Sequence, residues 1–254
     1  MVSQSARKNG ASHVYDQLKT LLVNHQFQPG TPLHPSDLGQ YLKVSSTPVR
    51  EALHRLGGEE LLLSIPNKGF FAKVLSSEEM IELSILMNAL MNYSVTSGLH
   101  ACGEIGVRKP PFKGKHITPP FNDEYDFDKS GDPAQSYSAL VEGLFENIGS
   151  FSENRCLVKL IRNLNDRTHY VLMLDLEDAD RRSEIVSLTQ SLLKHLKARN
   201  FPEVVVNLQQ QLRRRLALIP ALVKEGLARS HAACPQHVPP GRGIQNIDRM
   251  LAGT

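Results

Sequence analysis

Apolar residues recur every three or four positions along most of this 254-residue chain, a spacing that predicts a mainly helical protein. In the first third, the spacing indicates three short helices, at about 12–24, 35–42 and 45–56. Two strand-like segments follow, 61–65 and 70–74, and they flank a Pro-Asn-Lys-Gly turn sequence. A helix, a short turn, a second helix and a β-hairpin together predict a winged helix-turn-helix domain.

The remaining two thirds of the chain predict an all-helical bundle. A helix runs from about 76 to 99, and three or four long helices follow between 133 and 228. Between them, a stretch rich in proline and glycine, at about 103–131, predicts a long loop. The chain ends are polar or rich in proline. The predicted organisation is a disordered tail, a winged helix-turn-helix domain, a helical domain and a flexible tail, at 1–11, 12–75, 76–231 and 232–254.

The third predicted helix carries the most specific signal. The hydroxyl of Ser45 is expected to cap its start, and Pro48 falls in its first turn. Four apolar residues at helical spacing predict a buried stripe: Val49, Ala52, Leu53 and Leu56. The outward side then carries groups able to meet phosphates or base edges: Thr47, Arg50 and Arg55. Arg55 can equally pair with Glu51, one turn earlier on the same face.

The net charge of +3 is unevenly placed along the chain. Residues 1–75 hold eight Lys and Arg against five Asp and Glu, so the whole excess lies there and the remainder sums to zero. A basic N-terminal domain joined to a remainder without net charge is typical of a protein that binds nucleic acid. The densest basic run, Gln209 to Arg215, predicts a solvated helix face, with contact to a DNA backbone as the alternative.

Several classes of function lack support in this sequence. It contains no phosphate-binding glycine loop, nucleophile elbow or paired His-Glu motif, so we do not expect an enzyme. Three scattered cysteines, Cys102, Cys156 and Cys234, lack metal-type spacing and indicate free thiols in a reducing cytosol. No apolar run is long enough to span a bilayer, and the first residues lack the apolar core of a signal peptide. We therefore expect a cytoplasmic protein without a membrane partner.

Five segments of the first domain follow a recognisable pattern: Val14–Leu18, Gln28–Gly30, Asp37–Gly39, Val44–Leu53 and Lys68–Gly69. Together they resemble the GntR-type bacterial transcription regulators over about residues 12–75. The helical remainder more weakly resembles the effector-binding domain of the FadR-like branch of that family. In that branch the helical domain binds a metabolite and supplies the dimer contact, and the dimer places two recognition helices on a palindromic operator.

The resemblance implies which residues contact DNA. Base or phosphate contacts fall to Thr47 and Arg50 of the third helix, and the helix starts at Ser36 and Ser45 would face phosphates. The wing tip would reach the minor groove with three residues: Asn67, Lys68 and Gly69. An ordinary hairpin turn is the alternative interpretation of that tip.

One residue of the recognition helix departs from the family pattern. Ser46 stands where the family usually has Arg. The missing guanidinium removes a possible bidentate contact to guanine, worth about 1–3 kcal/mol of discrimination. We therefore expect an operator that differs from the common family site, or one that is bound less tightly.

The helical domain departs further from its relatives. Many of them hold a metal with one Asp and three His, but the corresponding positions here are Val141, Phe145, Thr189 and Gln211, a poor ligand set. Met87 and Met91 occupy the positions of the family's Arg and Glu in the first helix of this domain. We expect no metal or other cofactor, and either an apolar or weakly charged effector at these six residues or none. Ordinary core packing is the alternative.

Two functional hypotheses follow from the sequence. The first is a cytoplasmic, homodimeric transcription regulator that reads a palindromic operator, acts as a repressor and responds to a small molecule. The second is a degenerate relative that serves as a protein-interaction module and binds DNA without sequence preference. Retardation of DNA that survives competitor DNA would support the first, and binding that is indifferent to sequence and falls steeply with salt would support the second.

Overall fold

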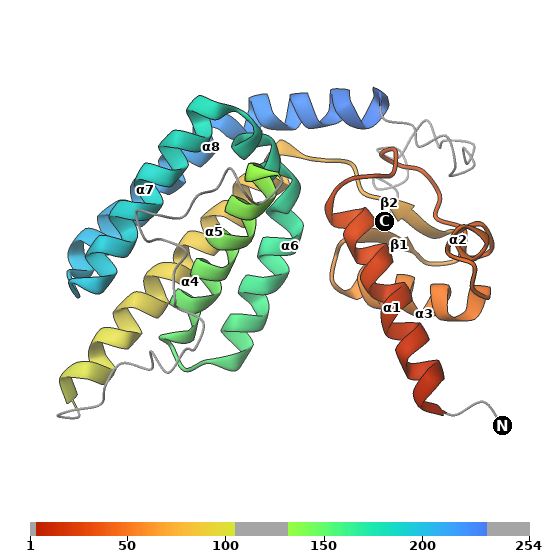
Figure 1. Cartoon of the computed structure of the whole chain (residues 1–254), viewed down its shortest axis with the longest axis horizontal. Coiled ribbons are helices and arrows are strands. Elements are labelled where there is room, and N and C mark those ends of the chain that lie inside the picture. Colours follow the sequence, from red (N-terminus) through yellow and green to blue (C-terminus); the bar gives the residue numbers. More distant parts are fainter. Residues whose placement is uncertain (1–3, 105–131, 233–254) are drawn as a thin grey trace. The chain divides into compact units, whose positions relative to one another are not determined.

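The computed structural model describes residues 4–104 and 132–232 (Figure 1). The chain divides into two compact units. The N-terminal unit comprises Met1–Ser76 with Lys224–Thr254, and the helical unit comprises Ser77–Val223.

The N-terminal unit contains three helices and a two-stranded antiparallel sheet, in this order: α1 (Gln4–Val23), α2 (Pro35–Leu42), α3 (Ser46–Gly58), β1 (Leu62–Ile65) and β2 (Gly69–Ala72). The register pairs Leu62 with Ala72 and Ile65 with Gly69. Pro32 adds an isolated bridge to Phe71. This arrangement is a winged helix-turn-helix, as the hydrophobic spacing predicts.

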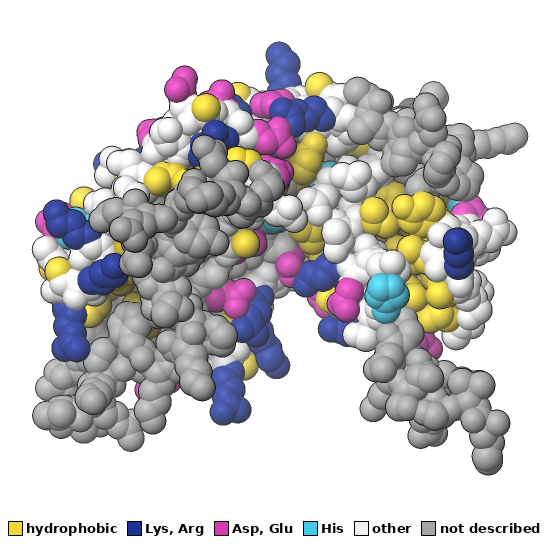
Figure 2. Space-filling model, viewed as in Figure 1, with side chains coloured by type: hydrophobic (Ala, Val, Ile, Leu, Met, Phe, Trp, Pro, Cys, Tyr) yellow, Lys and Arg dark blue, Asp and Glu magenta, His cyan; other side chains and the backbone are white. Residues whose placement is uncertain are grey.

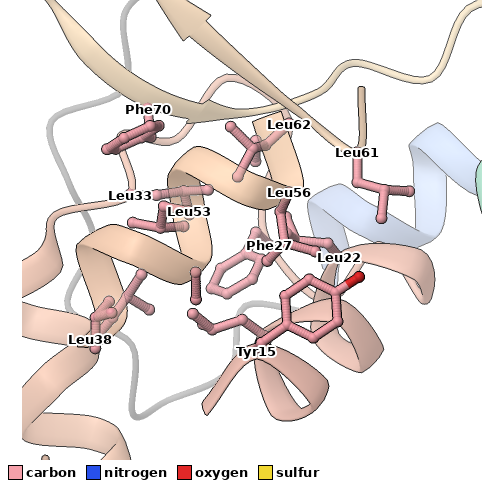
Figure 3. Close-up of a cluster of buried hydrophobic side chains, with 14 of the residues drawn as sticks. Tyr15, Leu22, Phe27, Leu33, Leu38, Leu53, Leu56, Leu61, Leu62 and Phe70 are labelled. Atoms are coloured by element: carbon pink, nitrogen blue, oxygen red, sulfur yellow. The ribbon is translucent and has the colours of Figure 1, made fainter. Parts of the chain in front are cut away.

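The core of the N-terminal unit forms where α1, α2 and α3 meet the hairpin (Figure 3). The predicted stripe of α3 is confirmed, because Val49, Ala52, Leu53 and Leu56 are all buried. They pack with Leu18 of α1 and with Phe70 of β2 in one continuous apolar cluster. Burial of this stripe fixes which side of α3 faces outward.

Helix α1 differs from the prediction at its start. The sequence assigns residues 1–11 to a disordered tail, whereas α1 begins at Gln4. Only residues 1–3 of that tail lie outside the described part of the chain. Ala6, Arg7 and Lys8 have high helix propensity, and extending a helix already nucleated by a packed segment gains one hydrogen bond per added residue.

The turn between α2 and α3 is tight. Lys43 ends α2 in the left-handed conformation, with φ of 56°, and the amide of Val44 donates to the carbonyl of Gly39 at 2.9 Å. A Cβ atom at Gly39 would lie 2.9 Å from the carbonyl oxygen of Val44. Glycine at this position therefore permits the close approach that sets the direction of α3.

The helical unit is built from four whole helices and most of a fifth (Figure 1): α4 (Ser77–Glu104), α5 (Pro133–Ser150), α6 (Arg155–Glu177), α7 (Ala179–Lys197) and the part of α8 (Phe201–Ala232) that ends at Val223. The carboxylate of Asp132 accepts from the amide of Ala134 and caps α5, as the Asp-Pro sequence predicts. The prediction of a mainly helical chain with an N-terminal winged helix-turn-helix is confirmed. The predicted loop at 103–131 falls outside the described residues beyond Glu104, and so does the predicted tail beyond Ala232.

The described helices include no candidate for a membrane-spanning segment. None of those within 4–104 or 132–232 combines the length and the apolar character needed to cross a bilayer.

Candidate nucleic-acid interface

The outward face of α3 lies opposite its buried stripe. Ser46, Thr47 and Arg50 are exposed there, while Val49 and Leu53 are buried on the other side. A helix advances about 100° per residue, so positions three, four and seven apart share a face. Thr47 and Arg50, three residues apart, are therefore presented together on a helix whose orientation the core fixes.

The start of α3 differs from the prediction for Ser45. Ser45 occupies the N-cap position with extended backbone, but its side chain makes no capping hydrogen bond. A capping hydroxyl accepts from the amide of the second or third helical residue. The third is Pro48, which has no N–H, so the most frequent partner is absent. The first-turn amides and the hydroxyl of Ser45 consequently remain available to an anion.

Ser36 lies in the first turn of α2, after a proline at the first helical position. Its exposed hydroxyl donates to the carboxylate of Asp37 at 2.9 Å. This local bond occupies the Ser36 hydroxyl in the structure. Any contribution of this helix start to phosphate binding therefore rests on its backbone amides, with the charge of Asp37 opposing it.

Arg55 has a different partner from the one expected. Its Nε atom lies 3.4 Å from the carboxylate of Glu59, one turn later in the chain, instead of pairing with Glu51. The guanidinium carbon lies 3.8 Å from the centre of the Tyr15 ring, a cation–π contact. Lys19 also approaches Glu59, at 3.6 Å. Arg55 therefore joins α3 to α1, although its side chain remains largely exposed.

The wing tip is a tight turn between β1 and β2. The amide of Lys68 donates to the carbonyl of Ile65 at 3.0 Å, and Asn67 has a φ of 61°. Proline at the second turn position and a positive φ at the third are typical of a type II turn. Gly69 has a φ of 101°, which glycine adopts without strain. The turn exposes Asn67, Lys68 and Gly69 at its tip.

A second candidate site lies inside the helical unit, where two small voids share Leu172, Asp175 and Arg215. One extends toward Met80 and Ile219, and the other extends toward α5 and α7. Each void has a volume of about 20 Å³. That is room for about one water molecule, so a larger ligand requires the helices to move apart.

The six residues predicted to line an effector pocket do not all line one void in the structure. Val141 and Gln211 line the same void. Phe145 lies beneath Arg215, whose guanidinium carbon is 5.8 Å from the centre of the ring. The other three are buried: Met87, Met91 and Thr189.

The residues at the positions of the family's metal ligands do not suit a metal ion. Two are hydrocarbon side chains, Val141 and Phe145, and they leave only a hydroxyl and an amide as oxygen donors. Among the described residues, no three His, Cys, Asp or Glu side chains gather in a group able to hold a metal. Three charged side chains line the void beside Val141 and Gln211 instead: Asp175, Arg214 and Arg215.

The run from Gln209 to Arg215 is only partly a solvated face. Arg213 is exposed, but the Arg214 side chain is 10% exposed and forms bonds of 2.6 and 3.1 Å to both oxygens of Asp175. Arg214 also reaches Glu184 at 2.6 Å. Burial alone lowers the pKa of Arg214, but its bonds to these two carboxylates outweigh that effect and raise it.

Arg215 lacks such a close carboxylate pair in the described contacts. Burial lowers the pKa of its guanidinium, which the charges of Asp175 and Glu142 only partly offset. Local pattern cannot predict the pairing of Arg214 with Asp175, because the two residues are 39 positions apart and meet only when α6 packs against α8. Over the face seen in Figure 2, acidic and basic side chains of the helical unit are interspersed.

Comparison with known families relates the first unit to one of them. The family model described as "Bacterial regulatory proteins, gntR family" matches residues 11–72. The match covers α2, α3 and the hairpin, together with most of α1.

Two curated proteins extend the similarity into the helical unit. The chain is 30% identical over 158 residues to the Nta operon transcriptional regulator of Aminobacter aminovorans, which covers 61% of this chain and 70% of that protein. It is 23% identical over 189 residues to YdhC of Bacillus subtilis, an uncharacterized HTH-type transcriptional regulator, with coverage of 73% and 80%.

Solved structures share the fold of both units. A putative transcriptional regulator GntR from Rhodococcus sp. RHA1 aligns with a TM-score of 0.58 and 20% identity over 84% of this chain and 98% of that one. Escherichia coli McbR/YncC aligns with a TM-score of 0.55 and 20% identity over 87% and 99%. Lar, which controls expression of the Listeria monocytogenes agr system, aligns with a TM-score of 0.61 and 13% identity over 84% and 97%.

Proposed function

This chain belongs to the gntR family of bacterial regulatory proteins and is a transcriptional regulator with a DNA-binding domain rather than an enzyme, and on that premise we propose that it is a sequence-specific repressor controlled by a small molecule. The proposal places it in the cytoplasm, bound as a homodimer to a palindromic operator. The observation that carries it is the outward face of α3, on which Thr47 and Arg50 are exposed together.

In the proposed complex, α3 enters the major groove and the wing lies over the adjacent minor groove. Thr47 and Arg50 contact base edges or phosphates. The open helix start at Ser45 and the backbone amides of α2 near Ser36 bind the DNA backbone. Lys68 at the wing tip supplies a cation to the phosphates.

A second copy of the chain is proposed to pack on α4. Ile85, Leu86 and Tyr93 of this helix are 49%, 40% and 55% exposed. Leu86 and Tyr93 lie seven residues apart and share one face, and Ile85 lies at the edge of that face. Exposed apolar side chains in a stripe favour an interface between proteins. A two-fold dimer places the same face of both copies in contact, which suits a palindromic operator.

The proposed effector site is the pair of voids beside Arg215. The Asp175–Arg214 pair is neutral as a whole, so the guanidinium of Arg215 favours an effector with a carboxylate or another anionic group. This differs from the apolar or weakly charged effector, or none, expected from the sequence. No metal takes part in the proposal, since the residues at the family's metal positions do not suit one.

Gel retardation with a duplex from upstream of the protein's own gene tests the proposed DNA binding. We expect retardation that survives excess unrelated DNA and is lost in Arg50→Ala. The matched control is Arg155→Ala, which removes an equal charge from an exposed site on α6 and leaves binding unchanged. Retardation that is indifferent to sequence and equal in both variants would contradict the proposal and support the protein-interaction module.

A further inference from the structure

We propose that His54 is a further DNA-contacting residue, whose imidazole donates a hydrogen bond to a phosphate between the major and minor grooves. The proposal rests on the contact of the α3 face with DNA described above. The sequence motif indicates Arg55 on this helix, whereas the structure places the preceding residue, His54, on the same exposed face as Thr47 and Arg50.

His54 lies near the middle of the exposed face of α3. It follows Thr47 by seven residues and Arg50 by four, so at about 100° per residue it projects roughly 20° from Thr47 and 40° from Arg50. Arg55 projects about 80° from Thr47 by the same measure and turns toward Tyr15 and Glu59 instead. His54 is exposed, and the buried stripe lies on the other side of the helix.

The His54 ring is held in place by the wing. It meets the ring of Phe70 edge to face, with centroids 4.8 Å apart and an interplanar angle of 84°. Phe70 is itself buried in the core cluster, on β2 directly after Gly69 (Figure 3). An edge-to-face pair restricts the imidazole to few orientations. A restrained side chain loses less conformational freedom on binding than a mobile one.

The position of His54 determines which part of DNA it meets. Thr47 lies in the first turn of α3, and His54 lies two turns further along, where the helix touches the wing strand. With α3 in the major groove and the wing over the minor groove, the sugar-phosphate strand that separates the two grooves passes between them. A ring N–H of His54 at that junction is placed to donate to a phosphate oxygen.

The experiment compares three variants by retardation of two duplexes, the upstream duplex and an unrelated one of equal length. His54→Phe keeps a ring against Phe70 but removes both ring nitrogens, and His54→Ala removes the ring altogether. His13→Ala, at an exposed position on α1, is the control. We expect both His54 variants to bind both duplexes about three- to tenfold more weakly than the wild type, and His13→Ala to bind normally.

Each outcome decides the proposal. Equal weakening on both duplexes, with an unchanged melting temperature in His54→Phe, supports a phosphate contact, because phosphates are the same in every sequence. Wild-type binding by His54→Phe overturns it and leaves His54 with a packing role only. Weakening on the upstream duplex alone also overturns it, in favour of a base contact. Since the unrelated duplex needs no operator, failure of sequence-specific binding and failure of this inference give different results.

Discussion

The hydroxyl of Tyr15 lies 2.7 Å from both carboxylate oxygens of Glu59, a residue 44 positions later in the chain. Tyr15 belongs to α1, and Glu59 caps the end of α3. Arg55 packs over the Tyr15 ring and pairs with the same carboxylate. The recognition helix is thus tied to α1 by a polar cluster at the edge of the apolar core.

Removing the Tyr15 hydroxyl should weaken this connection. We expect Tyr15→Phe to lower the free energy of unfolding by about 1–2 kcal/mol, since a hydrogen bond to a charged carboxylate is lost. Urea denaturation measures the change. Tyr41→Phe, at an exposed tyrosine on α2, is the matched control and should unfold like the wild type. Equal stability of all three proteins would contradict a structural role for the cluster.

The same variant carries a prediction about alkaline pH. Burial and the hydrogen bond to Glu59 raise the pKa of Tyr15 above its ordinary value of 10.0. The native state therefore holds the phenolic proton more tightly than the unfolded chain does. The Tyr15 contribution is complete below about pH 10 and is lost as the pH rises through the raised native pKa. The stability difference between wild type and Tyr15→Phe should accordingly shrink above pH 10.

Gly39 offers a test of the turn that directs α3. In Gly39→Ala the new Cβ meets the backbone oxygen of Val44 at 2.9 Å, and the backbone must shift to relieve the contact. We expect a loss of about 1–3 kcal/mol of stability together with weaker DNA retardation. Gly58→Ala is the control, since its Cβ has nothing within 4 Å. Thermal unfolding should show that this control is as stable as the wild type or slightly more stable.

A residue with strained backbone, Glu60, directly follows the C-cap of α3. Glu60 has a φ of 59°, while the amide of Leu61 donates to the carbonyl of Leu56 at 3.1 Å. Helix ends of this kind favour glycine at the left-handed position. Glu60→Gly should therefore raise the melting temperature, with a gain of about 0.5–1 kcal/mol. Glu60→Ala keeps the strained backbone, so a comparable gain in that variant would contradict the explanation.

Asp175 and Glu184 both bind Arg214 but should differ greatly in their effect on stability. Asp175 is 7% exposed and Glu184 is 57% exposed. Asp175→Ala removes the buried carboxylate from Arg214 and from Arg181, whose Nε atom lies 3.5 Å from it, and should cost about 3–5 kcal/mol. Glu184→Ala should cost less than about 1 kcal/mol. Replacing the pair by Asp175→Leu with Arg214→Met should recover much of the loss. Chemical denaturation of the four proteins compares these effects.

Local pattern was sufficient to predict most of the fold. The spacing of Val49, Leu53 and Leu56 predicts both the helix and its buried side, because apolar residues three or four positions apart lie on one side of a helix and that side packs on the core. The wing follows from its turn residues. The first residues of α1 were missed because their helical state depends on a packed segment that nucleates it further along the chain.

Long-range pairing explains what local pattern could not predict about the sites. Glu51 and Glu59 both lie one helical turn from Arg55, so the sequence alone cannot say which of them pairs with it. The contact of Arg55 with Tyr15 of α1 places its guanidinium beside Glu59. The sequence around Arg214 predicts a solvated charge, because its partner Asp175 lies on another helix, α6. The exposed side of His54 follows from its seven-residue spacing to Thr47, but its contact with Phe70 depends on how the hairpin packs against α3.

The small size of the voids beside Arg215 has a kinetic consequence for the proposed effector. Each void has room for about one water molecule, so the side chains or helices that line it must move before a larger effector can bind there. The observed association rate should then level off at high ligand concentration, at the rate of that movement, and the apparent affinity should be reduced by the small fraction of molecules that are open. A substitution that loosens the Asp175–Arg214 pair would speed the response to the signal while making the protein less stable.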